Sequence, residues 1–329
     1  MNYENIYQPI ENRLDFSDIQ TKTQAIKNEL KKVIVGQDDV IDQLLLALLS
    51  DGHSLIEGLP GVAKTMMAKL LAKTIEANFS RIQFTPDLMP SDVIGTSILN
   101  SKINEFEFKA GPIFANIVLI DEINRSPAKT QAALFESMSE KQVTVDGKTY
   151  PLTAPFLVFA TQNPIEQEGT YRLPEAQLDR FMFKIIVKYP TLENEIILLK
   201  EQQERKAIDK ETLIQQVIKG EEIVSFQQRI KSIYVHEVLL NYIATIVHQT
   251  RIDTALYIGA SPRASIAFLD SAKSNAAING RDFVIPEDIK QVAYAILGHR
   301  VIMVPEKEME GYTTQHIIQQ IIDRVEIPR

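Results

Sequence analysis

The sequence of 329 residues contains no cysteine, which excludes disulfides, thiolate metal sites and cysteine nucleophiles. Long hydrophobic runs are missing as well: segments such as 44–49 and 117–120 fall far short of the about 18 residues that span a membrane. Residues 1–10 lack the apolar segment of a signal peptide. We therefore expect a cytoplasmic protein without membrane insertion, stabilised by packing alone.

The sequence also lacks a basic region. It has 35 Lys and Arg against 43 Asp and Glu, a net charge of −8, and neither half is basic. Proteins that bind duplex nucleic acid usually present a basic face, because neutralised phosphates supply much of the affinity. Nucleic acid is therefore not expected as a partner.

The composition that remains is that of a globular protein, with 45% hydrophobic and 24% charged residues. At about 150 residues per domain, the length predicts two domains. Between residues 54 and 189 short apolar runs alternate with helical stretches, which is typical of βαβ units around a parallel sheet buried on both faces. The expected strands are 54–57, 81–84, 117–120, 156–159 and 183–187.

The periodicity changes after Tyr189-Pro190. Apolar residues between Val235 and Val247 recur at i, i+3, i+4 and i+7, as on one face of an amphipathic helix. Further helices are expected at 263–279, 286–297 and 313–325. The predicted organisation is an α/β domain over 1–190 followed by an all-helical domain over 191–329.

Two segments interrupt the βαβ pattern of the first domain. Alternating residues flank Asp146-Gly147, a pair that favours a type I′ turn, so residues 143–150 are expected to form a β-hairpin. A second insert of the same kind is expected over 104–114, where Phe106 and Phe108 alternate with charged residues. On these residues alone, both inserts could be surface decorations.

The sequence Gly58-Leu59-Pro60-Gly61-Val62-Ala63-Lys64-Thr65 follows the first expected strand and precedes a helix. Strand, glycine-rich loop, Lys-Thr and helix together indicate a phosphate-binding loop. Lys64 would reach the β and γ phosphates of ATP, and the hydroxyl of Thr65 would bind Mg²⁺. Ala63 stands where the general pattern has glycine, and we expect ordinary helical backbone angles there. The residues expected around the nucleotide are Gly58, Leu59, Pro60, Gly61, Val62, Ala63, Lys64, Thr65 and Met66.

Polar residues follow two later strands. Asp121 and Glu122 end the strand 117–120, beside the expected phosphate loop at the carboxyl edge of the sheet. Asp121 would bind Mg²⁺ together with Thr65, and Glu122 would orient and deprotonate the attacking water. Asn163 follows the next strand and could hydrogen-bond the water or the γ-phosphate.

Arginines are candidates for cancelling the negative charge that develops on the γ-phosphate. Arg180 lies at the end of an expected helix before the last strand, and Arg263 opens a helix of the second domain. No role is assigned to Arg125 or Arg172.

Taken together, these motifs resemble the AAA+ ATPases and, among them, the MoxR family. Residues 58–65 resemble its Walker A motif, alanine included, 120–125 its Walker B motif and 160–164 its sensor 1. Residues 173–181 resemble the segment with the arginine finger, and 261–263 the start of the sensor 2 helix. The segment of Val35, Gly36 and Gln37 resembles the one that packs on adenine.

The resemblance implies a homo-oligomeric ring, commonly a hexamer, that binds ATP and Mg²⁺ between subunits. Arg180 would act on the nucleotide of the neighbouring subunit, and Arg263 on that of its own. The inserts would correspond to projecting hairpins near 100–112 and 142–152. The family is regarded as chaperone-like, acting on protein clients, usually with a partner that has a von Willebrand factor A domain.

Two other readings stay open at this point. One is a related AAA+ motor on another client, such as a magnesium chelatase subunit or a nucleic-acid translocase. The other is a nucleotide-gated scaffold with negligible turnover.

Overall fold

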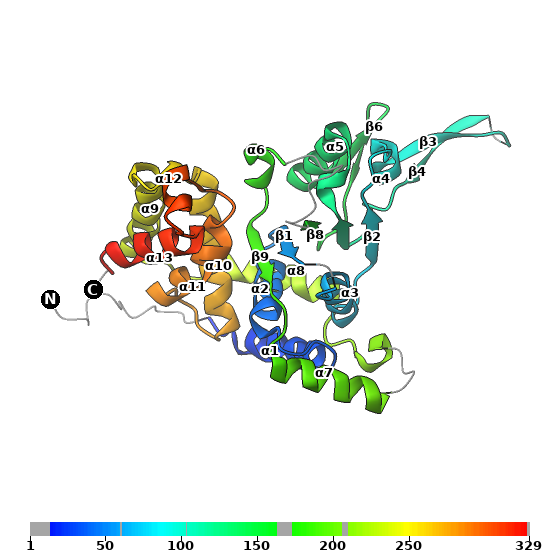
Figure 1. Ribbon diagram of the computed structural model, residues 1–329. Helices are drawn as coiled ribbons and strands as arrows, with labels where there is room; N and C mark the ends of the chain where they lie inside the picture. Colours follow the sequence, from blue (N-terminus) through cyan, green and yellow to red (C-terminus); the bar gives the residue numbers. More distant parts are fainter. Residues whose placement is uncertain (1–13, 60, 103, 163–172, 206–209, 328–329) are drawn as a thin grey trace. The chain divides into compact units, whose positions relative to one another are not determined.

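The computed structural model describes residues 14–59, 61–102, 104–162, 173–205 and 210–327, which form two compact units (Figure 1). The sheet-containing unit comprises residues 25–181 and 185–224, and the helical unit the rest. Residues 191–224, which the sequence assigns to the helical domain, group by their contacts with the sheet-containing unit. Hydrogen bonds contribute to this grouping: the backbone N–H of Val217 donates to the carbonyl of Thr74 at 2.8 Å.

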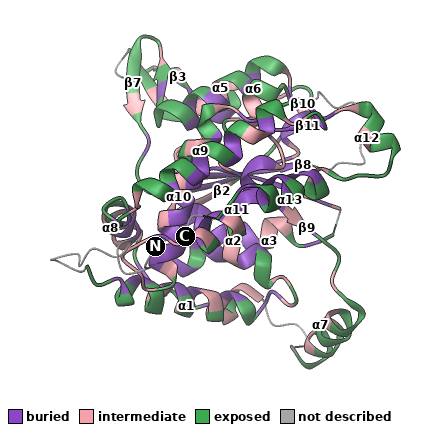
Figure 2. Cartoon of the chain, turned by 90° about the vertical axis from the view of Figure 1, so that its left-hand side faces the viewer, coloured by how far each residue is buried: buried purple, intermediate pink, exposed green. Residues whose placement is uncertain are grey.

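A five-stranded sheet organises the first unit, in the order β2-β5-β8-β1-β9. The pairs β2–β5, β5–β8 and β1–β8 are parallel, as the alternating pattern predicts. Strand β5, between β2 and β8, is buried at every position. Figure 2 shows buried and exposed residues on the same helices, with exposed outer faces on helices such as α1 and α7. The strands are β1 (Ser54–Gly58), β2 (Phe79–Gln83), β5 (Ile117–Asp121), β8 (Leu157–Gln162) and β9 (Phe183–Val187).

Helices and two antiparallel hairpins complete this unit. The helices are α1 (Ser17–Lys31), which begins in the helical unit, α2 (Asp38–Leu49), α3 (Lys64–Thr74), α4 (Pro90–Ile94), α5 (Ala128–Glu140), α6 (Glu175–Leu178) and α7 (Leu192–Arg205). Short 3₁₀ turns are η2 (Ile123–Arg125) and η3 (Lys210–Leu213). The hairpins are β3 (Gly95–Asn100) with β4 (Glu105–Ala110), and β6 (Gln142–Val145) with β7 (Lys148–Pro151).

Both expected hairpins are present, but the first spans residues 95–110 instead of 104–114. In the second, Asp146 and Gly147 have φ of 51° and 76°, the positive values that a type I′ turn requires at both central residues. The first begins at Gly95, earlier than the sequence indicates, and extends away from the sheet (Figure 1). Leu99 and Phe106 are paired near its tip and are 51% and 74% exposed. Phe108, nearer its base, instead stacks on Tyr150 of the other hairpin at 4.1 Å.

Over residues 225–327 the second unit is helical apart from one short pair of strands, so the expectation of an all-helical domain is wrong on this point. Its α10 and α11 begin at prolines, and the side chain of Ser261 caps α10 by accepting the N–H of Arg263 at 3.1 Å. The elements are α8 (Gly220–Ile230), which begins in the sheet-containing unit, α9 (Glu237–Ile252), β10 (Leu256–Ile258), α10 (Pro262–Ile278), α11 (Pro286–Leu297), β11 (Ile302–Met303), α12 (Pro305–Met309) and α13 (Thr314–Arg324).

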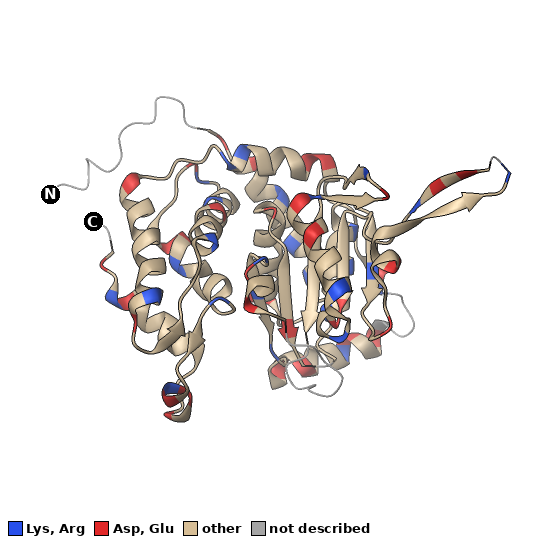
Figure 3. Cartoon of the chain, turned by 90° about the horizontal axis from the view of Figure 1, so that it is seen from above, with Lys and Arg blue, Asp and Glu red and all other residues tan. Residues whose placement is uncertain are grey.

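Surface charge is mixed in both units. Acidic and basic residues are interspersed along the helices of both units (Figure 3), and β4 carries Glu105, Glu107 and Lys109. Within the described ranges, no helix combines the length and apolar character that crossing a membrane requires.

His53 precedes β1 and is buried with partners on both ring nitrogens. Its Nδ1 accepts the N–H of Val158 at 3.0 Å, and its Nε2 lies 3.1 Å from the carbonyl oxygen of Met138. These partners fit a neutral ring with the proton on Nε2. Burial lowers the pKa of His53 from 6.5 to about 4.

We therefore expect the protein to lose stability as the pH falls from 6.5 to 4. Above pH 6.5 the His53 ring is neutral in both the folded and the unfolded chain, so it adds no pH dependence. Between 6.5 and 4 only the unfolded chain takes up the proton, which favours unfolding by about 3 kcal/mol at the lower end. Urea unfolding at several pH values measures this slope, and His53→Gln should make it shallower. Equal slopes in parent and variant would contradict the expectation.

Candidate functional site

The loop between β1 and α3 has the backbone features of a phosphate-binding loop. A Cβ on Gly58 would lie 2.7 Å from the carbonyl oxygen of Val187 on β9, so only glycine fits there. Gly61 has a φ of +83°, in the region that favours glycine. Leu59 is partly exposed and Val62 buried, whereas Pro60 lies outside the described residues. The loop delivers the chain to the N-terminus of α3, where the first N–H groups of the helix and its dipole favour a phosphate.

The expectation of helical angles at Ala63 is wrong. Ala63 is the N-cap of α3, with φ 60° and ψ 26°, in the left-handed region. The methyl group of an L-residue there crowds the following carbonyl, which costs roughly 1–2 kcal/mol. The general pattern has glycine at this position because glycine avoids that cost, and the chain carries the strain in its candidate site.

Lys64 and Thr65 begin α3 at the mouth of this loop. The Lys64 ammonium donates to the carbonyl of Gly58 at 2.5 Å, so the side chain folds back across its own loop. The Thr65 hydroxyl lies 3.4 Å from Oδ2 of Asp121, at the end of β5. Met66 follows, partly exposed. The sequence prediction that the loop and the end of β5 meet at one edge of the sheet is therefore consistent with these contacts.

Asp121 is 7% exposed and is held at both carboxylate oxygens. Oδ1 accepts the Thr161 hydroxyl at 3.1 Å, and Oδ2 accepts Nε of Arg81 at 2.6 Å. Arg81 comes from β2, which neighbours β5 in the sheet. The carboxylate is thus fixed with Oδ2 toward Thr65.

Glu122 directly follows β5 and has left-handed backbone angles, φ 57° and ψ 52°. Its N–H donates to the hydroxyl of Thr161 at 3.0 Å, which holds this turn against β8. Its carboxylate accepts Nε2 of Gln83 at 2.8 Å and forms an ion pair with Arg125 at 3.2 Å. Such backbone strain is often found where a side chain must be aimed at a reacting group.

The oxygens of Thr65 and Asp121 fit a magnesium ion. They are 3.4 Å apart, close to the about 3.0 Å expected between neighbouring oxygens around octahedral Mg²⁺. Over the described part of the chain, no three His, Asp or Glu side chains cluster as a metal cage. A Mg²⁺ held here would complete its shell with phosphate oxygens and water, as is usual for this ion.

The segment before α2 also needs its glycine. Gly36 has a φ of +69°, and a Cβ on it would overlap the side chain of Asn194 of α7. Gln37 donates from Nε2 to the carbonyl of Lys188 at 2.8 Å, while Val35 is partly exposed. These contacts fix the segment at the end of β9, but its role in binding adenine stays a prediction.

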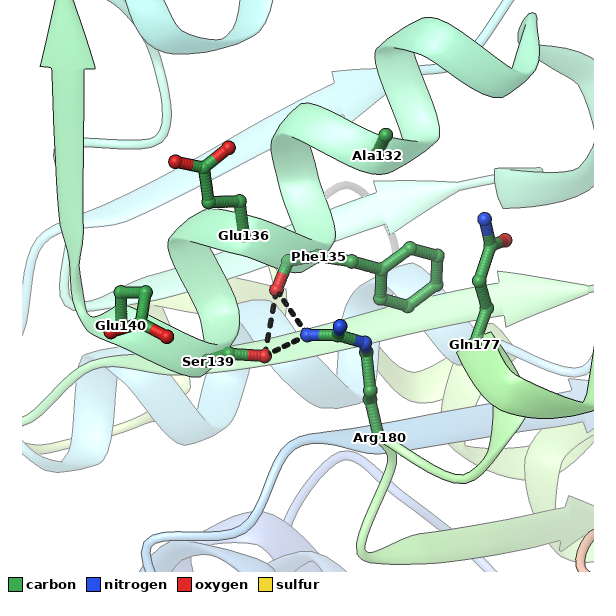
Figure 4. A pocket seen from close by; sticks show the side chains of 7 residues that line it. All are labelled: Ala132, Phe135, Glu136, Ser139, Glu140, Gln177 and Arg180. Carbon is green, nitrogen blue, oxygen red and sulfur yellow. Dashed lines mark hydrogen bonds between the residues drawn. The ribbon is translucent and has the colours of Figure 1, made fainter.

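Arg180 lies against the last turn of α5 (Figure 4). Its Nη1 donates to the carbonyl of Phe135 at 3.2 Å and to the hydroxyl of Ser139. Together with Gln177 and two glutamates of α5, Glu136 and Glu140, it lines an open pocket of about 350 Å³ (Figure 4).

The end of α5 that Arg180 contacts also contacts the residue that precedes β1, which places Arg180 near the amino end of that strand. Met138, in the same turn of α5, accepts from His53, which immediately precedes β1. The phosphate loop begins at Gly58, the last residue of that strand. The five residues of β1 extend about 16 Å. Arg180 therefore lies toward the amino end of β1, whereas the phosphate loop begins at the carboxyl end of that strand.

The roles expected for Asn163 and Arg263 stay predictions. Asn163 and Arg172 lie outside the described residues. Arg263 is exposed in the first turn of α10, in the helical unit. Arg125, for which no role was predicted, pairs with Glu122.

Sequence reasoning missed Arg81, Gln83 and Thr161, which hold the two acids. Arg81 and Gln83 are two residues apart on β2, so they share one face of the sheet, and Gln83 pairs in register with Asp121. The available signal was the alternation of polar and apolar residues at the end of β2, where Arg81 and Gln83 flank Ile82. It becomes informative only once β2 and β5 are known to be neighbours.

Comparison with known proteins identifies both parts of the chain. Residues 53–183 match the model of an ATPase family associated with various cellular activities (AAA), and residues 248–321 match the AAA lid domain. The crystal structure of a Cytophaga hutchinsonii protein described as an ATPase superposes with a TM-score of 0.87 at 45% identity. That match covers 95% of this chain and 97% of the other.

Curated relatives agree over nearly the full length. The uncharacterized protein YeaC of Bacillus subtilis is 48% identical, covering 91% of this chain and 92% of its own. Chaperone MoxR1 of Mycobacterium tuberculosis is 41% identical, and the match covers 95% of this chain and 84% of the relative. Protein MoxR of Methylorubrum extorquens is 27% identical, covering 95% and 97%. The chain, with its parallel-sheet core and helical lid, belongs to the MoxR family of AAA+ ATPases.

Proposed function

We propose that this protein hydrolyses Mg²⁺-bound ATP between adjacent copies of itself and uses the cycle to remodel or activate a protein client. The observation that carries the proposal is the convergence of Lys64, Thr65, Asp121 and Glu122 at one end of the sheet, with Arg180 at the other. Family membership supports nucleotide binding, and the name of the mycobacterial relative, Chaperone MoxR1, supports a protein client.

Each side chain has a task that follows from its position. The N–H groups at the start of α3 would bind phosphate oxygens, and Lys64 would leave the carbonyl of Gly58 for the β and γ phosphates. Thr65 and Asp121 would hold Mg²⁺, which neutralises charge on the phosphates. Glu122 would accept the proton of the attacking water. Asn163 would orient that water or the γ-phosphate.

Arg180 would complete the site of a second copy. Within one chain it lies toward the end of β1 that is far from the phosphate loop, which favours action on the nucleotide of a neighbour. A guanidinium supplied by a neighbour would cancel charge on the γ-phosphate. This arrangement requires a homo-oligomer, and a hexameric ring fits the family. Arg263 of the lid would bind the nucleotide of its own subunit.

The β3–β4 hairpin is the surface we propose for contact with a client. Its tip exposes Leu99 and Phe106 side by side, whereas Phe108 and Val145 pack closer to the unit. Exposed apolar side chains on a projecting hairpin favour contact with another protein. A partner with a von Willebrand factor A domain would fit the family's usual pairing.

We expect Glu122→Gln with ATP to form an assembly several times the 37.2 kDa of one chain, because bound nucleotide then persists between subunits. Light scattering with and without ATP measures the mass, and Lys64→Ala is the control that should stay at the mass of one chain. An unchanged monomer mass with ATP would contradict the ring.

Capture from a cell extract with Glu122→Gln should retain a von Willebrand factor A-domain protein. Adding Leu99→Ser and Phe106→Ser should abolish binding of the client without loss of ATP binding.

A further inference from the structure

Arg81 lies in the candidate site, but the roles proposed above do not use it. Its Nε donates to Oδ2 of Asp121 at 2.6 Å, and its Nη2 lies 3.4 Å from Oε1 of Gln83. The Arg81 side chain is 53% exposed and that of Asp121 only 9%. A cation from the surface of β2 therefore reaches a buried carboxylate.

The oxygen that Arg81 holds is the oxygen on which the proposed metal site depends. Oδ1 of Asp121 is engaged by Thr161, and Oδ2 is the oxygen that lies 3.4 Å from the Thr65 hydroxyl. A metal shared by Thr65 and Asp121 would have to bond to Oδ2. A divalent cation and a guanidinium on one oxygen repel each other strongly at such distances.

The balance of charge points in the same direction. Asp121 and Glu122 are adjacent carboxylates, and each is paired with an arginine, Arg81 and Arg125. The pairs relieve the repulsion between the two acids in the protein alone. A carboxylate that is already paired gains less from a second cation than a bare one does.

We propose that Arg81 competes with Mg²⁺ for Oδ2 of Asp121, and so sets the Mg²⁺ concentration that nucleotide binding requires. The inference rests on the proposed function, since it takes Asp121 and Thr65 as the metal ligands. Arg81 is a positioning residue: it holds the carboxylate until the metal takes the same oxygen.

The test is binding of a fluorescent ADP analogue to the full chain, titrated with Mg²⁺. Arg81→Ala should lower the Mg²⁺ concentration for half-maximal binding about fivefold, because the metal no longer displaces a half-exposed ion pair. Arg81→Lys, which keeps the charge, should stay close to the parent. Saturating Mg²⁺ and nucleotide should also raise the melting temperature more in Arg81→Ala than in the parent.

The helical unit supplies a matched control. Arg324 pairs with Asp253 at 2.8 Å, and the two side chains are 63% and 7% exposed, nearly the values of the Arg81–Asp121 pair. Arg324→Ala removes the same kind of ion pair elsewhere and should leave the Mg²⁺ titration unchanged.

Three results would overturn the inference. An unchanged or higher Mg²⁺ requirement in Arg81→Ala would mean that Arg81 does not compete with the metal. Weaker nucleotide binding without Mg²⁺ would make Arg81 a nucleotide contact instead. Absence of nucleotide binding by the parent at any Mg²⁺ concentration would remove the proposed function itself, and so is distinct from the other two. If Arg81→Ala does not fold, Arg81→Gln carries the same expectation, because it keeps a hydrogen-bond donor without the charge.

Discussion

Glu122→Gln is expected to slow ATP hydrolysis by about 10² to 10⁴-fold while leaving nucleotide affinity unchanged. Glutamine keeps the size of the side chain and an oxygen that can accept from Gln83, but it cannot take a proton from water. The strained backbone of Glu122 and its bond to Thr161 remain, because they involve main-chain atoms of residue 122. The change therefore removes the base and, with its charge, the ion pair to Arg125.

Phosphate release under saturating ATP measures the rate, and a fluorescent nucleotide measures the affinity. Glu195→Gln, at an exposed position on α7, is the control for replacing a glutamate by its amide and should hydrolyse ATP at the parent rate. A Glu122→Gln protein as fast as the parent would show that another group activates the water.

Arg180→Ala is expected to reduce turnover by about 10³ to 10⁵-fold, the range found for arginine fingers supplied by a neighbouring subunit. In the chain itself the guanidinium rests on Phe135 and Ser139 at the amino end of β1, away from the loop at Gly58. Its removal should therefore not disturb nucleotide binding by the same subunit.

Mixing subunits separates action on a neighbour from action within one chain. Arg180→Ala subunits keep an intact phosphate loop, and Lys64→Ala subunits keep an intact arginine. In an equal, random mixture, about one quarter of the interfaces join the two intact halves and should regain the parent rate. Lys64→Ala mixed with Glu122→Gln is the matched control: both changes affect the same half of the site, so no interface recovers. Failure of the first mixture to recover would contradict action of Arg180 on a neighbouring subunit.

The sequence predicted the parts of the fold that depend on local pattern. The buried run 117–120 identifies a strand because a sheet covered on both faces selects apolar, β-branched residues. The strand 183–187 is also rich in apolar residues, with buried and partly buried positions in alternation. The loop of Gly58 and the turn at Asp146-Gly147 were predictable for a similar reason, since few residues adopt their backbone angles.

The missed features depend on neighbours that are distant in the sequence. Arg81 and Gln83 could not be assigned without the pairing of β2 with β5, which aligns residues almost forty positions apart. The early start of the first hairpin escaped notice because its strands are largely exposed and have no buried face to impose alternation. The left-handed angles of Ala63 were missed because the angles depend on the path of the whole loop into α3.

The separate placement of Arg180 and the phosphate loop gives each chain two different interface surfaces, one with the arginine and one with the nucleotide site. A contact between the arginine surface of one chain and the nucleotide surface of the next is heterologous, so such contacts can add copies in an open row. In an open row, the phosphate loop at one end and the Arg180 at the other have no neighbouring subunit to complete a site. Closing the row into a ring joins these two and adds one complete site without adding a subunit. Under the proposed mechanism, the catalytic geometry itself therefore favours closure over an open filament.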